Sequence, residues 1–219
     1  MSKSDSQRAE FVTRVTTDVT HELRNVLAIV KETAGLIDDL MTFSQSNSLN
    51  HNKIKSLAGR IEPQADRGAE LASVLHHVAR SCENPGHSTD LNQATAHVVV
   101  MCYRLARKKR QSMRVRPFDH VVHVVCDRLR AYMAIHAAIE CCLELLPESA
   151  VLNIHVGSPA DGAPVDLVGS LEESAIQIDP TQALAWNTLT DAVAGIGASL
   201  KVEKAQCGLR IAFSLSSVG

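Results

Sequence analysis

The sequence predicts an α+β protein, in which a helical hairpin (residues 1–83) is followed by an α/β-sandwich domain (residues 90–219). Apolar residues in the first part recur at three- and four-residue steps, which is the period of an amphipathic helix. After the turn-rich segment SCENPGHSTD (81–90), helical patterns alternate with short stretches typical of strands. Aromatic residues are only 3% of the chain, while Ala, Val and Leu dominate, and this composition favours helix-rich packing.

Two long helices account for the hairpin. Residues 8–43 predict the first helix, and the polar stretch SQSNSLNHN (44–52) predicts a turn after it. A second helical pattern continues to residue 78, and we expect Pro63 to kink or interrupt it. The apolar positions of the first helix are Leu23, Val26, Leu27, Val30, Ala34, Ile37 and Met41.

The apolar stripes of this hairpin are too broad for two helices to cover each other. Pairing two hairpins around a two-fold axis would bury both stripes in a four-helix bundle, so we expect a homodimer. The alternative is that the stripes pack against the rest of the same chain.

The second part of the chain predicts a sheet that is covered on one face by helices, because strand patterns alternate with helical ones. Helices are predicted at 91–109, 128–146 and 181–195. Strands are predicted at 112–118, 120–126, 151–156, near 165–168 and 175–178, and at 199–203 and 209–215.

The motif VTHELRNVLAIV (19–30) places His21, Glu22 and Asn25 on the first helix. At 3.6 residues per turn, His21 points away from the apolar stripe, and Asn25 follows on the same face with Arg24 beside it. A neutral imidazole can act as a nucleophile, a neighbouring carboxylate can hold or accept its other proton, and an amide can orient water or a phosphoryl oxygen. The set suits in-line phosphoryl transfer. The alternative is that all of them are ordinary solvated helix residues.

The segment HELRNVLAIV resembles the phosphoacceptor box of sensor histidine kinases, in which a histidine is followed by an acidic residue and, four positions on, by Asn or Thr. Val26 stands where that family often has proline. Residues 64–81 resemble the second helix of the same dimerisation domain. Residues 88–109 resemble the opening of the ATP-binding domain, residues 126–147 its nucleotide-box helix, and the closing helix and two strands its C-terminal end.

The resemblance implies that His21 carries the phosphoryl group, that Glu22 and Asn25 assist the chemistry, and that Arg24 and Ala28 contact a response-regulator receiver domain. In the best register, His136 and Glu140 take the positions of two nucleotide-binding asparagines. The glycine-rich segments of the family are missing: Gly169 stands alone in an acidic stretch, and Gly195-Ile196-Gly197 is placed like a helix C-cap. We therefore expect no tightly bound cofactor, with Mg²⁺ held by the receiver partner.

Charge and composition do not indicate a class of partner other than the receiver domain. The net charge is −2, and the basic run between residues 104 and 116 carries no interleaved aromatic residues, so we expect no nucleic acid. That run is either a cationic helix end with a charged strand edge or a patch for an acidic protein. His120, His123 and Cys126 are three residues apart in a predicted strand, so neighbours in this series face opposite sides and predict no metal site.

Targeting and redox signals point to the cytoplasm. The opening residues MSKSDSQRAE are polar, unlike a secretory signal, and no apolar run approaches a membrane span. The six cysteines show no CxxC spacing, and we expect reduced, mostly buried thiols.

Three functions compete. The first is a histidine phosphotransfer protein of a two-component phosphorelay, in which His21 exchanges phosphoryl groups with receiver aspartates and Asn25 also supports receiver dephosphorylation. The second is a small sensorless histidine kinase that labels His21 from ATP. The third is a non-catalytic module that sequesters a signalling partner.

Overall fold

A computed structural model gives the fold and describes residues 3–43, 51–83, 86–171, 174–176, 179–203 and 208–213. The chain divides into two compact units. One is a helical hairpin, residues 13–77, and the other combines residues 1–12 with residues 78–219. The predicted α+β class is confirmed, because long helices are followed by a mixed sheet.

The hairpin consists of α1 (Lys3–Phe43) and α2 (His51–Glu83). Helix α2 continues through Pro63, so of the predicted kink or interruption the interruption is wrong. A proline inside a helix removes one backbone hydrogen bond. Here the ring lies on the exposed side, while Leu57 and Leu71 before and after it are buried on the inner side and hold the helix together.

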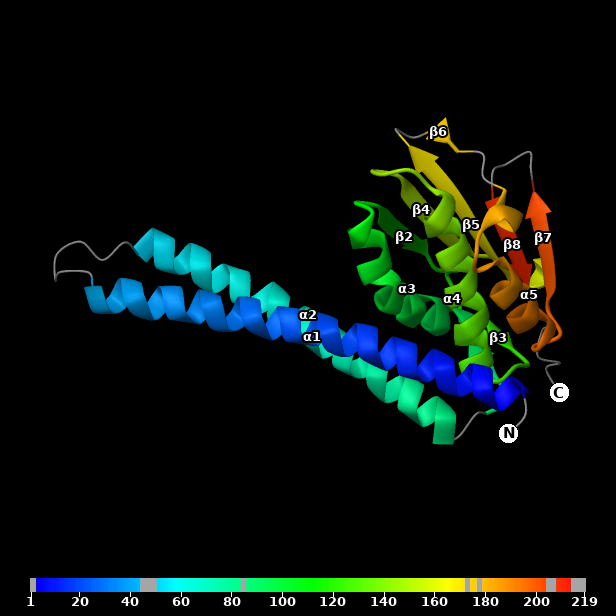
Figure 1. Ribbon diagram of the computed structural model, residues 1–219, viewed down its shortest axis with the longest axis horizontal. Coiled ribbons are helices and arrows are strands. Elements are labelled where there is room, and N and C mark those ends of the chain that lie inside the picture. The colour runs from blue at the N-terminus through cyan, green and yellow to red at the C-terminus, as the bar shows by residue number, and fades with distance from the viewer. Residues whose placement is uncertain are drawn as a thin grey trace. The chain divides into compact units, whose positions relative to one another are not determined.

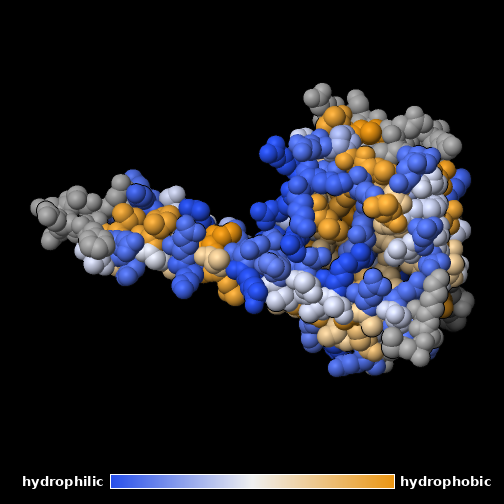
Figure 2. Space-filling view, viewed as in Figure 1, coloured by the Kyte–Doolittle hydropathy of each residue, from blue (hydrophilic) through white to orange (hydrophobic). Residues whose placement is uncertain are grey.

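The buried line of α1 differs from the predicted stripe. It contains Val15, Val19, Glu22, Val26 and Thr33, whereas Leu27 and Met41 are 64% and 59% exposed. Figure 2 shows hydrophobic residues in patches along the surface of the hairpin. The two helices therefore bury only part of their apolar residues against each other.

The second unit contains a mixed sheet with the strand order β2-β4-β5-β8-β7. Strand β2 (Ser112–Arg116) is parallel to β4 (Val151–Val156), and the pairings of β5 (Pro164–Leu171), β8 (Gly208–Ala212) and β7 (Ser199–Glu203) are antiparallel. Strand β6 (Ser174–Ala175) extends the edge of β5. A separate pair joins β1 (Thr89–Asp90) to β3 (His123–Val124).

Three helices cover one face of this sheet (Figure 1). They are α3 (Leu91–Lys108), α4 (Arg128–Leu145) and α5 (Trp186–Ala194). The strands alternate accordingly: Leu152, Ile154 and Val156 of β4 are buried, whereas His155 is exposed. Helix α4 forms the centre of the core, since twelve of its residues are buried, on all sides of the helix.

The first turns of α1 are bonded to this domain. Arg8 Nη2 lies 2.5 Å from Asp127 Oδ2, and Asp127 also caps α4 by accepting from the backbone N–H of Leu129. Phe11 packs edge-on against the ring of His136, with 5.4 Å between the ring centroids. These contacts explain why residues 1–12 group with the sheet.

Several predicted elements are shorter in the structure. The strand predicted at 120–126 is reduced to β3, because the preceding residues bond instead to Asn92, whose side chain pairs with Phe118 N–H and with the carbonyls of Phe118 and His120. Helix α5 begins at Trp186 rather than at residue 181, since Pro180–Gln182 forms a 3₁₀ turn capped by Asp179. A second 3₁₀ turn covers Pro159–Asp161. The predicted strand residues 177–178 and 214–215 lie outside the described residues.

The cysteines are mainly core residues. Cys102, Cys126, Cys141 and Cys142 are buried and free, and Cys82 is free and exposed. Burial raises the pKa of the Cys141 thiol to about 12 and that of Cys142 further still. These two thiols are therefore protonated and unreactive at neutral pH. Cys207 lies outside the described residues.

Gly169 has a packing role, which gives a prediction about stability. A Cβ at this position would lie 2.2 Å from Leu146 Cδ2, and Leu146 is itself buried. We expect Gly169→Ala to lower the free energy of unfolding by about 1–3 kcal/mol through overpacking, as measured by urea denaturation. Gly35→Ala in α1, where a Cβ meets nothing within 4 Å, is the control and should stabilise by about 0.5–1 kcal/mol. Equal stability of Gly169→Ala and the native chain would contradict this packing role.

Candidate functional site

The candidate site lies in the middle of α1, on its exposed face. His21, Arg24, Asn25 and Ala28 are all exposed. Their spacing of three, four and seven residues places them side by side on one surface of the helix. Val19 and Val26, on the opposite side, are buried. The helix therefore holds the imidazole outward while its other face is fixed in the hairpin.

Glu22 lies inward, unlike its neighbours. The residue is only 5% exposed. Its Oε1 accepts a 2.8 Å bond from Arg67 Nη2 of α2, and its Oε2 accepts a 3.4 Å bond from Asn25 Nδ2. Adjacent residues on a helix do not face each other, so Glu22 does not face His21. Its carboxylate instead binds Arg67 of α2 and Asn25. The sequence predicted Glu22 as a neighbour of His21, and the structure adds the two partners that its carboxylate binds.

Arg67 is a site residue that sequence analysis did not identify. It approaches Glu22 because α1 and α2 lie close together at this level: a Cβ on the next residue, Gly68, would lie 3.4 Å from Val26 Cγ1. One signal in the sequence could have found it. A glutamate placed among buried positions needs a cation from a facing helix, and Arg67 is a basic residue of the second helix.

Of the two predicted nucleotide-box positions on α4, His136 is closed, whereas the Glu140 side chain is 26% exposed. His136 is only 3% exposed and is covered by Phe11. Its Nδ1 lies 3.7 Å from Glu140 Oε2, one helical turn away. The side chain of His136 is therefore held inside the domain, and any ligand that reached it would have to displace Phe11.

Gly169 and the Gly195–Gly197 pair have structural roles. Gly169 belongs to strand β5, where it is paired with Leu152 and packed against Leu146. Gly195 is the C-cap of α5, and Gly197 has a positive φ of 66°. The N–H groups of both return to carbonyls of the last helical turns, at Asp191 and Ala194. These N–H groups therefore donate to carbonyls at the end of a helix and not to a phosphate.

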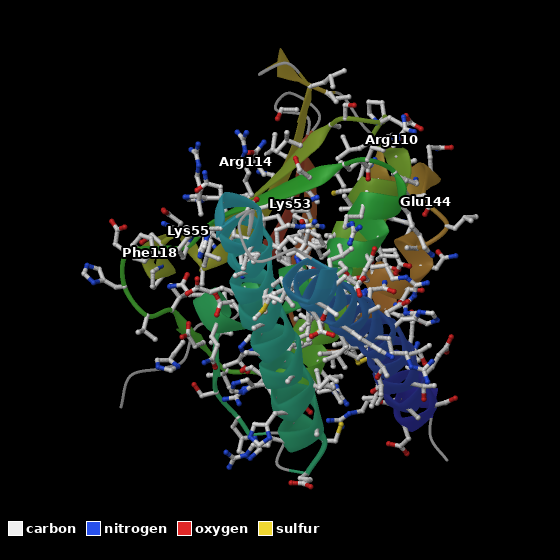
Figure 3. All side chains as sticks on the ribbon, turned by 90° about the vertical axis from the view of Figure 1, so that its left-hand side faces the viewer. Lys53, Lys55, Arg110, Arg114, Phe118 and Glu144 are labelled. Atoms are coloured by element: carbon white, nitrogen blue, oxygen red, sulfur yellow. The ribbon has the colours of Figure 1, made fainter. Side chains whose placement is uncertain are left out.

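Basic residues of the run between residues 104 and 116 make different contacts in the structure. Lys109 Nζ donates to the carbonyls of Leu143 and Glu144 at the end of α4, at 3.1 and 2.7 Å. Arg110 lies 3.7 Å from Glu148, and both side chains are exposed. Figure 3 shows Arg110 and Arg114 well apart on the domain. Lys109, Arg110 and Arg114 therefore do not form a single patch, which favours the first of the two interpretations of this run.

Comparisons with known proteins give similarity to solved structures only. No family model matches the chain, and no curated protein matches it. The histidine kinase AdeS of Acinetobacter baumannii is 12% identical, with 90% of this chain and 98% of that chain covered and a TM-score of 0.48. The catalytic domain of histidine kinase ThkA is 14% identical, covering 59% and 97%, with a TM-score of 0.47. The histidine kinase domain of the blue-light-activated kinase EL346 of Erythrobacter litoralis is 14% identical, covering 84% and 96%, with a TM-score of 0.41. These similarities do not assign an activity to this chain.

The described helices include none that is both long enough and apolar enough to cross a membrane.

Proposed function

We propose that this chain is a histidine phosphotransfer protein of two-component signalling that acts as a homodimer in the cytoplasm. The observation that carries the proposal is the exposed His21 with Asn25 beside it, on a helix whose opposite face is buried. Arg24 and Ala28 border the imidazole on the same surface and provide the area on which a receiver domain would dock.

The proposed transfer needs little from this chain beyond position. The unprotonated nitrogen of His21 attacks the phosphorus of a receiver aspartyl phosphate, and a P–N bond forms as the P–O bond breaks. The electron pair of the broken bond returns to the aspartate as a carboxylate. Mg²⁺ on the receiver neutralises the phosphoryl oxygens. The reverse reaction passes the group to another receiver.

The same surface supports dephosphorylation of the receiver. The Asn25 amide lies one turn from His21, and in a docked complex it could orient a water molecule toward the aspartyl phosphate. Attack by that water would release inorganic phosphate and aspartate. His21 has no covalent part in this reaction.

Two features of the second unit support phosphotransfer over ATP-dependent autophosphorylation. His136 is covered by Phe11 at the predicted nucleotide-box position. Gly169 and the Gly195–Gly197 pair are committed to packing and to a helix end. Phosphate binding requires backbone N–H groups that are open to the ligand, and those of Gly195 and Gly197 are used within the chain.

Two parallel labelling reactions test the proposal. The pure protein is incubated with γ-labelled Mg-ATP in one and with a labelled, phosphorylated receiver in the other. We expect acid-labile label on the protein from the receiver alone. Label from ATP would select a histidine kinase instead. No label from either source, with the receiver phosphate stable, would leave the non-catalytic binding module.

A further inference from the structure

A chain of three polar side chains connects α2 to the exposed surface of α1. Arg67 donates to one oxygen of Glu22, and Asn25 donates to the other. The first bond is short and joins two charged groups, whereas the second is longer, at 3.4 Å. The exposed amide is thus joined through a buried carboxylate to an arginine on the neighbouring helix.

Burial strengthens the effect of Arg67 on this arrangement. The Glu22 side chain is 6% exposed and that of Arg67 is 23% exposed. A carboxylate removed from water is strongly disfavoured unless a cation or several donors are bound to it. Arg67→Met would remove the short charged bond to Oε1, so the carboxylate that Asn25 also binds would be held less firmly in place.

The same contacts determine how the Asn25 amide is oriented. An ionised carboxylate only accepts hydrogen bonds, so the amide presents its nitrogen to Glu22. The oxygen and nitrogen of an amide diverge from the same trigonal carbon atom, so the oxygen points in a different direction from the nitrogen that binds Glu22. An amide oxygen is an acceptor that can hold a proton of an attacking water molecule.

We propose that Arg67 is a positioning residue for Asn25, which it orients through Glu22 so that the amide oxygen faces a docked receiver. Arg67 thereby supports dephosphorylation separately from phosphoryl transfer through His21. This inference rests on the proposed function. In this proposal Glu22 orients Asn25. It does not act as a base for His21.

The test compares Arg67→Met, which keeps the aliphatic length and removes the charge, with Arg67→Lys, Asn25→Ala and the control Arg60→Met. Arg60 is exposed on the same helix. Each variant is assayed for kcat and KM of receiver dephosphorylation and for transfer of label to His21. Circular dichroism confirms that each variant is folded.

We expect Arg67→Met to lower kcat for dephosphorylation by about 10- to 100-fold, as for other groups that orient a reacting residue. KM and label transfer should stay within about threefold. Arg67→Lys should recover most of the lost kcat, and Arg60→Met should match the native protein. The double variant Asn25→Ala with Arg67→Met should be no slower than Asn25→Ala alone, because both changes remove the same contribution.

Several results would overturn the inference. They are an unchanged kcat in Arg67→Met, an equal fall in transfer and dephosphorylation, and losses that multiply in the double variant. Transfer by the native protein without any dephosphorylation would also overturn it while leaving phosphotransfer intact. A native protein with neither activity would instead contradict the proposed function itself.

A folding failure of Arg67→Met is covered by a second variant. Glu22→Gln combined with Arg67→Met removes both buried charges, so no carboxylate is left without a partner. An amide at position 22 can still accept from Asn25, but it can equally donate, so it no longer specifies which end of Asn25 faces outward. We expect this folded double variant to lose dephosphorylation by about tenfold, and native kcat would overturn the inference.

Discussion

Replacing His21 with alanine is expected to reduce phosphoryl transfer from a phosphorylated receiver to background. The reason is chemical: the exposed imidazole supplies the nitrogen that forms the P–N bond, and neither Asn25 nor Arg24 on the same face can form a comparable bond at neutral pH. The measurement is the acid-labile label on the protein after incubation with a labelled receiver. Dephosphorylation of the receiver should persist in His21→Ala, because the Asn25 amide and its bond to Glu22 remain.

The matched control is His76→Ala. His76 is also an exposed histidine on a helix of the hairpin, but it does not belong to the surface formed by His21, Arg24, Asn25 and Ala28. Its replacement should leave labelling unchanged. Native levels of label in His21→Ala would place the phosphoryl group elsewhere and refute the proposed function. Loss of label in both variants would point to a general effect on the hairpin.

Replacing Leu27 and Met41 together with lysine is expected to convert the proposed dimer to monomers. Leu27, Ala34 and Met41 recur every seven residues and are all exposed. Ala58, Ala65 and Ala72 of α2 repeat in the same way and are also exposed. Large side chains on one helix and small ones on the other are suited to interdigitation between two hairpins.

The expected size of this effect follows from apolar burial. Fully burying a side chain of this kind contributes about 1.5–3 kcal/mol, and a two-fold interface contains each position twice. Losing four such side chains should raise the dimer dissociation constant by about 10⁴-fold or more. Sedimentation equilibrium measures this change directly.

Leu36→Lys provides the control for the dimer prediction. Leu36 is 43% exposed on the same helix, but it is outside the seven-residue series of Leu27 and Met41. It should therefore leave the dimer intact. Equal dissociation of Leu36→Lys would indicate a nonspecific effect of added charge, and a native chain that is monomeric at all concentrations would contradict the proposed interface.

Much of the fold could be predicted from local sequence. Apolar periodicity predicts the hairpin helices, the three helices of the second domain and most strands. The spacing of apolar residues differs between helices and strands, so it indicates the local backbone conformation directly. The outward position of His21 follows from the same argument. The Gly195–Gly197 pair was also predicted as a helix end, since a glycine at such a position commonly adopts a positive φ, as Gly197 does.

Features that depend on residues far apart in the chain could not be predicted in this way. Asn92 bonds to the segment around Phe118 and replaces a predicted strand. Phe11 covers His136, although 125 residues of sequence separate them. Gly169 packs against Leu146, a contact that a count of glycines in the sequence cannot show.

Helical spacing sets which residues face together, so the printed sequence is enough to place an imidazole, an amide and a basic side chain on one exposed face of a long helix. The contacts behind that face depend instead on how α1 packs against α2. The pairing of Glu22 with Arg67 depends on the close approach of α2 at Gly68. A buried charge is stable only where a second element brings its partner within hydrogen-bonding distance, and the packing of the two helices meets that condition.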